Sequence, residues 1–126
     1  AIQDYDEAIR LNPQDADAYN NRGIAYGNIG QYKQAVQDHN EAILLNPQYT
    51  YAYNNRAASK CKLADYKGVV SDASMAIKLD PKYGYAYLNR GIAKEMLRDP
   101  DGACTDWEKA AALGINTGKT YSTDCE

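Results

Sequence analysis

The chain has 126 residues, of which 44% are hydrophobic and 25% are charged, and its formal net charge is -3. This length and composition are typical of a single globular domain rather than of a disordered segment. The sequence has no block of basic residues, which argues against a nucleic-acid partner, and no apolar run of about 18 residues, which argues against membrane insertion.

A fixed interval runs through the whole sequence. The prolines at positions 13, 47 and 81 are evenly spaced, and the segment AYNNR at 18–22 returns with the same spacing at 52–56 and, as AYLNR, at 86–90. Self-similarity at periods of about 20 to 50 residues indicates an array of stacked structural units. We therefore expect one such unit for every interval.

The predicted elements follow this interval in chain order. Residues 1–15 are expected to form a single helix, equivalent to the second helix of a truncated unit. Three helix pairs are expected in residues 16–49, 50–83 and 84–116, which makes about seven helices in all. In the unit 16–49, Gly30 is expected to end the first helix with a positive φ, and Pro47 is expected to end the second helix. In the unit 84–116, Asp99 is expected to cap the N-terminus of the second helix. Residues 117–126 are rich in poor helix formers, so we expect a poorly structured tail with at most one loose turn.

The pattern within each unit resembles the tetratricopeptide repeat. It has an aromatic residue near the start of the first helix, a Gly or Ala one turn later, alanines on the second helix and a closing proline. The segments AYNNRGIAYGNIGQYKQAVQDHNEAILLNP and AYLNRGIAK…GACTDWEKAAALG carry the resemblance, which covers nearly the whole chain. It implies an all-α, right-handed superhelical solenoid of antiparallel helix pairs, with a concave ligand-binding surface made mainly by the first helices.

One arginine occurs in each repeat, where the family usually has an apolar residue. An arginine that faces a neighbouring helix needs a partner, because an unpaired buried charge costs several kcal/mol. Each arginine has one aspartate ahead of it and one behind it at constant spacing, so the sequence leaves open whether pairs form within a repeat or between repeats. We expect structural ion pairs rather than a phosphate-binding ladder, among Arg22, Arg56, Arg90, Asp38, Asp72 and Asp106.

Asn21, Asn55 and Asn89 each precede one of these arginines. One residue turns a helix by about 100°, which places these asparagines toward the concave surface. A side-chain amide both donates and accepts, so it can pair with the main chain of an extended peptide. Other repeats of the family bind ligands through such an asparagine ladder, and the resemblance implies the same role here. The alternative is a solvated polar face.

Other residues are expected beside this ladder in the concave groove. Asn20 and Asn54 would flank it, Tyr51 and Tyr85 would line its lip, and further contacts come from Ile24 and Ile92. Some cochaperone members of the family clamp a carboxylate with lysine and arginine. This chain has Asn20, Tyr85 and Asn89 at those cation positions, which argues against the binding of chaperone tails.

The three cysteines and one histidine are too scattered for a disulfide framework or a zinc finger. Cys104 and Cys125 could be bonded if the tail folds back over its helix in an oxidising compartment, and the sequence leaves this open. The cytoplasm is slightly favoured over the periplasm, which would require removal of a signal. We expect His39 to be a half-buried core residue and Trp107 to fill the last space between helices.

These observations favour a non-catalytic protein-interaction module that binds an extended peptide or a partner helix. No nucleophile–base pair, metal motif or glycine-rich phosphate loop is present, so we expect no enzyme activity, no cofactor and no metal. The alternative is self-assembly through the N-terminal half repeat. There, the apolar stripe of Ile2, Tyr5 and Ile9 would stack end to end against another copy.

Overall fold

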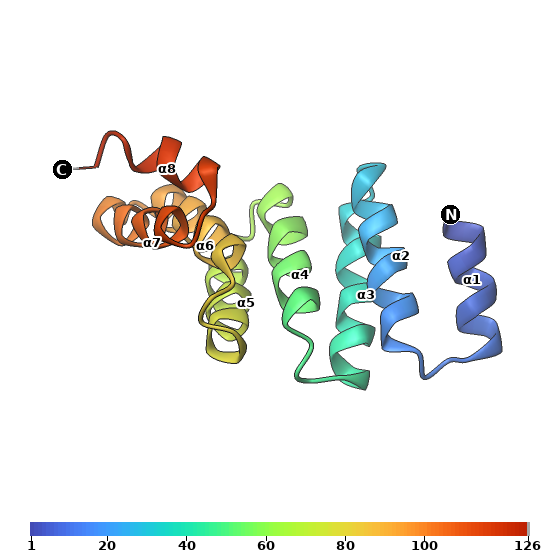
Figure 1. Cartoon of the computed structure of the whole chain (residues 1–126). Coiled ribbons are helices and arrows are strands. Elements are labelled where there is room, and N and C mark those ends of the chain that lie inside the picture. Colours follow the sequence, from blue (N-terminus) through green and yellow to red (C-terminus); the bar gives the residue numbers. More distant parts are fainter. Residues whose placement is uncertain (126) are drawn as a thin grey trace.

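A computed structural model describes residues 1–125 and shows eight α-helices joined by short turns (Figure 1). They are α1 (Ile2–Leu11), α2 (Ala16–Asn28), α3 (Tyr32–Leu45), α4 (Thr50–Lys62), α5 (Tyr66–Leu79), α6 (Gly84–Met96), α7 (Pro100–Ala112) and α8 (Asn116–Ser122). The described residues contain no strand. Helices α2 to α7 form three antiparallel pairs, which is the all-α solenoid that the sequence predicts.

Each first helix of a pair ends at the same kind of turn. Gly30, Ala64 and Arg98 occupy the same position of successive repeats and have φ of 81°, 60° and 65°. A left-handed conformation costs a non-glycine residue roughly 1 kcal/mol or more. The second and third repeats accept that cost because the chain must reverse within a few residues. The last second helix then begins at a cap, where Asp99 accepts a hydrogen bond from the N–H of Gly102.

The helices pack through small side chains. The largest fully buried side chains are only His39 and Val69. Small residues let helix backbones approach closely, and tyrosines such as Tyr53 seal the edges of the thin core. The fully enclosed alanines are Ala35, Ala42, Ala52, Ala57, Ala73, Ala76, Ala86, Ala93, Ala103 and Ala110.

The first helices form one layer and the second helices form another. Helix α4 contacts both α2 and α6 in addition to its own partner α5, so successive first helices lie along a shared face. Figure 1 shows α2 and α3 from the side but α6 and α7 nearly end-on, which shows how far the stack has turned over three pairs. This twist turns successive first helices relative to one another along their shared face.

The C-terminal tail differs from the sequence prediction. Residues 116–122 form the helix α8 rather than at most one loose turn, and residues 1–125 therefore contain eight helices where about seven were expected. Gly118 is buried, and a Cβ there would lie 2.8 Å from the Cβ of Ala110. The ring of Tyr121 also packs 5.2 Å from that of Trp107. The prediction was wrong because packing against α7 outweighs poor helix propensity.

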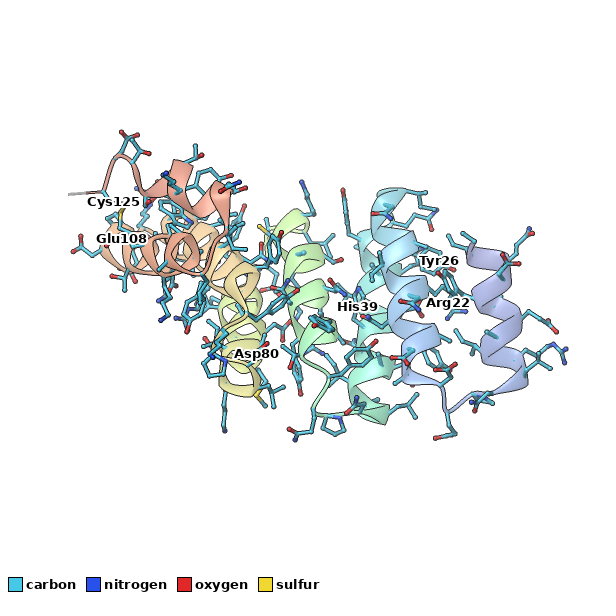
Figure 2. The ribbon with its side chains drawn as sticks, in the orientation of Figure 1. Arg22, Tyr26, His39, Asp80, Glu108 and Cys125 are labelled. Atoms are coloured by element: carbon cyan, nitrogen blue, oxygen red, sulfur yellow. A yellow bond between two sulfur atoms is a disulfide. The ribbon has the colours of Figure 1, made fainter. Side chains whose placement is uncertain are left out.

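A disulfide between Cys104 and Cys125 ties the end of this tail to α7 (Figure 2). It uses two of the three cysteines, which leaves Cys61 and His39 as the remaining Cys and His side chains of the sequence. Within residues 1–125, no three His, Cys, Asp or Glu side chains gather where they could hold a metal ion. None of the helices in this range has the length and apolar character needed to cross a bilayer.

Thiol titration tests the disulfide directly. We expect one reactive thiol per chain, that of Cys61, when the protein is denatured without reductant, and three after reduction. The variant Cys61→Ser should show none before reduction. Three thiols in the unreduced wild type would contradict the bond.

Candidate functional site

The arginines of the repeats form ion pairs within their own repeat. Arg22 donates from Nε to Asp38 Oδ2 and from Nη2 to Asp38 Oδ1, both at 2.8 Å. Arg56 binds Asp72 in the same bidentate way, at 2.9 and 2.7 Å. The third repeat has the matching pair, Arg90 and Asp106. Of the two pairings that the sequence leaves open, the structure has the one with the downstream aspartate.

The remaining guanidinium nitrogen of each arginine reaches the preceding second helix. Arg22 Nη1 donates to Asp6 Oδ1 at 2.8 Å, and its position between α2 and α1 is visible in Figure 2. The equivalent contacts are Arg56 to Asn40 at 2.8 Å and Arg90 to Ser74 at 3.2 Å. The arginines therefore fasten neighbouring repeats together. Each guanidinium thus uses three of its N–H donors in contacts between helices of the solenoid.

The asparagine ladder lies on the layer of first helices, but its members are not equally free. Asn21 is exposed, whereas Asn55 and Asn89 are half-buried. Asn55 Nδ2 donates to Asn20 Oδ1 at 3.3 Å, and Asn89 Nδ2 donates to Asn54 Oδ1 at 2.9 Å. Each of these two amides thus donates one N–H to the preceding repeat, while its carbonyl oxygen and its second N–H form no such bond.

The expectation that Asn20 and Asn54 flank the ladder as ligand contacts is wrong. Their exposed fractions are only 3% and 6%. Asn20 Nδ2 donates to the hydroxyl of Tyr49 at 3.3 Å, and Asn54 has the same bond to Tyr83. The amides are buried because the loop tyrosine and the next ladder asparagine close over them. Those partners come from other elements, so the helical register alone did not reveal them.

In the first repeat, a chain of hydrogen bonds fixes the direction of every donor. Tyr49 donates its hydroxyl proton to Asp17 Oδ1 at 2.7 Å, because an ionised carboxylate can only accept. That hydroxyl must therefore accept from Asn20 Nδ2, which turns Asn20 Oδ1 toward His39 Nδ1 at 2.9 Å. An amide oxygen accepts, so Nδ1 of His39 carries the proton. Its Nε2 is consequently an acceptor.

The environment keeps this network in one protonation state. Burial lowers the pKa of His39 to about 4, and the charge of Arg56 acts in the same direction, while Asp72 opposes them. Burial and the bond to Asp17 raise the pKa of Tyr49 to about 12. Both rings are neutral at pH 7. His39 is 1% exposed, so it is more deeply buried than the half-buried core position expected from the sequence.

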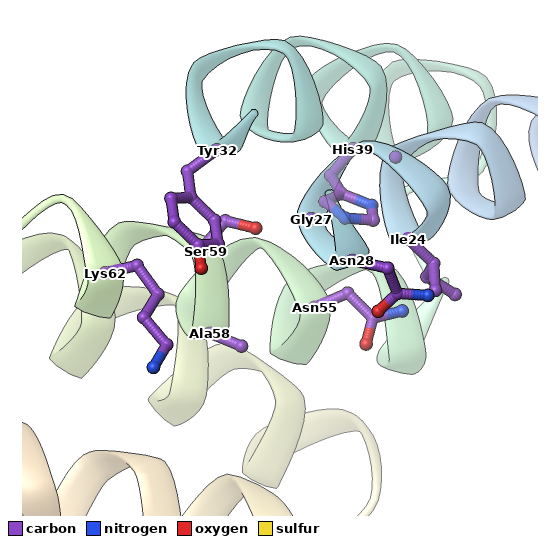
Figure 3. A pocket seen from close by; sticks show the side chains of 10 residues that line it. Ile24, Gly27, Asn28, Tyr32, His39, Asn55, Ala58, Ser59 and Lys62 are labelled. Atoms are coloured by element: carbon purple, nitrogen blue, oxygen red, sulfur yellow. The ribbon is translucent and has the colours of Figure 1, made fainter. Parts of the chain in front are cut away.

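A cavity of about 230 Å³ opens beside His39, between α2, α3 and α4 (Figure 3). It is lined by Gly23, Ile24, Gly27, Asn28, Tyr32, His39, Asn55, Ala58, Ser59 and Lys62. Ile24 and Asn55 were expected in the groove, whereas Gly27 and Ser59 were not singled out. One signal for the cavity is in the sequence. Gly27 stands where the next repeats have Cys61 and Glu95, so only the first repeat lacks a side chain there.

Exposed aromatic rings lie at the starts of α4 and α6, outside this cavity. Tyr51 and Tyr85 are the second residues of α4 and α6, and their exposed fractions are 57% and 54%. The ring of Tyr83 lies between them, 5.3 Å from Tyr51 and 6.0 Å from Tyr85. Ile24 is 40% exposed. The layer of first helices therefore presents amides, tyrosine rings and isolated aliphatic side chains.

Comparisons with known proteins agree with this architecture. The tetratricopeptide-repeat family matches residues 16–49, and a second TPR-repeat model matches residues 1–30. No curated protein sequence matches the chain.

Solved structures with the same fold include "Crystal structure of MamA", with a TM-score of 0.85, 18% identity and coverage of 95% of this chain and 75% of that one. The Arabidopsis OM64 TPR domain has a TM-score of 0.80 at 28% identity, covering 85% and 93%. The first TPR of Spaghetti (RPAP3), bound to an HSP90 peptide, has a TM-score of 0.83 at 25% identity, and the match covers 86% of this chain and 88% of that one. The two repeat models and the three helix pairs at the repeat's own interval support a tetratricopeptide-repeat protein.

Proposed function

We propose that the protein is a non-catalytic interaction module that holds an extended peptide in the groove formed by α2, α4 and α6. The observation that carries the proposal is the set of side chains facing that groove. Asn21 is exposed, Asn55 and Asn89 keep unused amide atoms, and tyrosine rings lie beside them. The likeness to TPR domains bound to HSP90 and HSP70 peptides supports a polypeptide ligand.

The asparagine amides would bind the main chain of the peptide. A carbonyl oxygen and an N–H on one amide match the N–H and C=O of an extended residue. Asn55 and Asn89 are held by their bonds to the buried asparagines, so little side-chain freedom would be lost on binding. The groove lacks the lysine and arginine clamp for a terminal carboxylate, because Asn20, Tyr85 and Asn89 stand at those positions. We therefore propose binding along the length of a peptide rather than capture of its end.

Selection from a displayed library of random peptides tests this function. We expect the wild-type domain to enrich binders, and the triple variant Asn21→Ala, Asn55→Ala, Asn89→Ala to bind them at least about tenfold more weakly, since each lost hydrogen bond contributes roughly 0.5 to 1.5 kcal/mol. A matched control changes three exposed polar residues of the second helices, with Lys33→Ala, Gln34→Ala and Lys67→Ala.

The possible results separate the alternatives. Enrichment by wild type and control, but not by the ladder variant, supports the groove. Equal binding by both variants contradicts the ladder, and no enrichment by the wild type contradicts the function itself. Thermal unfolding of each variant checks that the fold is intact. Sedimentation of the wild type over a range of concentrations shows whether the alternative, end-to-end self-association, occurs instead.

A further inference from the structure

The cavity beside His39 contains a polar atom that no other residue uses. Asn20 occupies Nδ1 of the ring, and within residues 1–125 no group forms a hydrogen bond with Nε2. His39 is 1% exposed, and the part of it that is exposed lines the cavity. Trp107 Nε1 is the one fully enclosed side-chain nitrogen or oxygen without a partner in residues 1–125, so the unpaired Nε2 of His39 must be open to the cavity. An occupant that donates to it would gain a hydrogen bond.

The hydrogen-bond chain from Asp17 decides what the occupant must supply. The carboxylate of Asp17 orients Tyr49, Tyr49 orients Asn20, and Asn20 holds the proton of His39 on Nδ1. Nε2 therefore presents a lone pair toward the cavity. A matching ligand group is an O–H or N–H donor, and a second acceptor such as a carboxylate oxygen would be repelled.

The size and walls of the cavity restrict the occupant further. A volume of about 230 Å³ is below the roughly 300 to 1,000 Å³ of sites for whole small-molecule ligands, so the cavity fits a single side chain. Ile24, Ala58 and the ring of Tyr32 give it apolar walls, and Gly27 leaves one side open. These features match a flat apolar ring with a donor at its tip.

We infer that this cavity is the anchor subsite of the groove and accepts one tyrosine side chain, whose ring lies against Ile24 and Ala58 and whose hydroxyl donates to Nε2 of His39. The inference rests on the proposed function in one respect, namely that the tyrosine belongs to a bound peptide. Lys62 is exposed at the open side, so an acidic residue next to that tyrosine would find a cation.

The subsite can be tested without any peptide, by using p-cresol as the tyrosine side chain. NMR of the labelled protein should first show the His39 proton on Nδ1. Addition of p-cresol should then shift the Nε2 resonance of His39 and the amide signals of Gly27 and Ser59, with saturation at millimolar concentration. 4-Methylanisole keeps the ring and the oxygen but has no donor, so it should bind about five- to tenfold more weakly.

Two variants localise the effect. In Gly27→Leu the new side chain fills the cavity, and its Cβ meets nothing nearer than Ser59 Oγ at 3.9 Å, so the helix is not strained. We expect p-cresol binding to weaken at least tenfold. Glu95→Leu adds the same side chain at the equivalent, exposed position of the third repeat and should leave binding unchanged.

Several results would overturn the subsite. The first two are a proton on Nε2 in the free protein and p-cresol binding that survives Gly27→Leu. The others are binding of 4-methylanisole as tight as that of p-cresol, or equal or tighter binding of 3-methylindole, which represents the tryptophan side chain. Peptides from the library provide the second measurement. We expect them to share a tyrosine whose change to phenylalanine weakens binding about five- to tenfold. Library binders without such a tyrosine would contradict the subsite while leaving the proposed function standing.

Discussion

Replacing Asp72 with asparagine is expected to lower the free energy of unfolding by about 3 to 5 kcal/mol. The Asp72 carboxylate is 3% exposed and pairs with two cations, the guanidinium of Arg56 and the ammonium of Lys60, the latter at 3.0 Å. Asparagine keeps the shape but removes the charge. The side chain of Arg56 is 18% exposed, so its charge would be left largely desolvated without a counterion.

The first repeat provides a matched comparison. Asp38 pairs with Arg22, but Arg22 also binds Asp6 at 2.8 Å and would keep a carboxylate after Asp38→Asn. The residue equivalent to Lys60 is Tyr26, so no second cation is stranded. We therefore expect Asp38→Asn to lower stability by about 1 to 2 kcal/mol, in the range of a lost charge-assisted hydrogen bond.

A charge-balanced variant separates the ion pair from the packing around it. Arg56→Met combined with Asp72→Leu removes both charges of the bidentate pair and keeps comparable volume. The ammonium of Lys60, on a side chain that is already 21% exposed, can then turn to solvent. An apolar replacement of a buried pair is often neutral, so the double variant should recover most of the stability lost in Asp72→Asn. Urea unfolding at pH 7 measures all three. Equal losses for Asp72→Asn and Asp38→Asn, or a double variant as unstable as the single one, would contradict this account.

The repeat interval accounts for most of the fold, and the reason is physical. A unit that recurs at a constant interval must present the same faces to its neighbours, so helix ends, turns and the alanine core follow from one another. The same logic placed an arginine and a carboxylate in each repeat. The interval does not predict whether each arginine pairs with the upstream or the downstream carboxylate, because the pairing depends on how adjacent helix pairs are rotated relative to one another.

The failures occur where a residue departs from the repeat or depends on several elements at once. Gly118 is a poor helix former, yet α8 needs it in order to lie against Ala110. The helical register placed Asn20 beside the groove. Its burial could not be predicted from that register, because it depends on Tyr49 from the following loop and on His39 from α3. His39 itself was expected only as core. Its unused nitrogen becomes visible only when the cavity and the direction of each hydrogen bond are known.

The second large effect expected is a pH dependence of stability that originates in His39. Its pKa is about 4 in the folded chain, against 6.5 for an ordinary histidine. Between these values the unfolded chain binds a proton that the folded chain does not. Stability is therefore complete above pH 6.5 and falls as the pH drops toward 4. The shift corresponds to a loss of about 3 kcal/mol by pH 4.

His39→Ala isolates this contribution from that of the carboxylates. The second repeat already has Ala73 at the equivalent position, so the fold accommodates alanine there. The variant should be less stable than wild type at pH 7, because it loses the bond to Asn20 and the packing against Gly23. Its stability should then fall less steeply, so that the difference between the two proteins narrows by about 3 kcal/mol between pH 7 and pH 4.

The carbon-bound ring proton of His39 reports the same equilibrium directly. Its NMR signal should stay constant down to about pH 5, because burial and the charge of Arg56 both disfavour the imidazolium. A signal that titrates near 6.5, together with parallel stability curves for wild type and His39→Ala, would mean that the ring is not desolvated. In that case the ring could be protonated near neutral pH, and Nε2 could not accept a hydroxyl proton from a tyrosine in the cavity. This titration therefore bears on stability and on recognition through the same nitrogen atom.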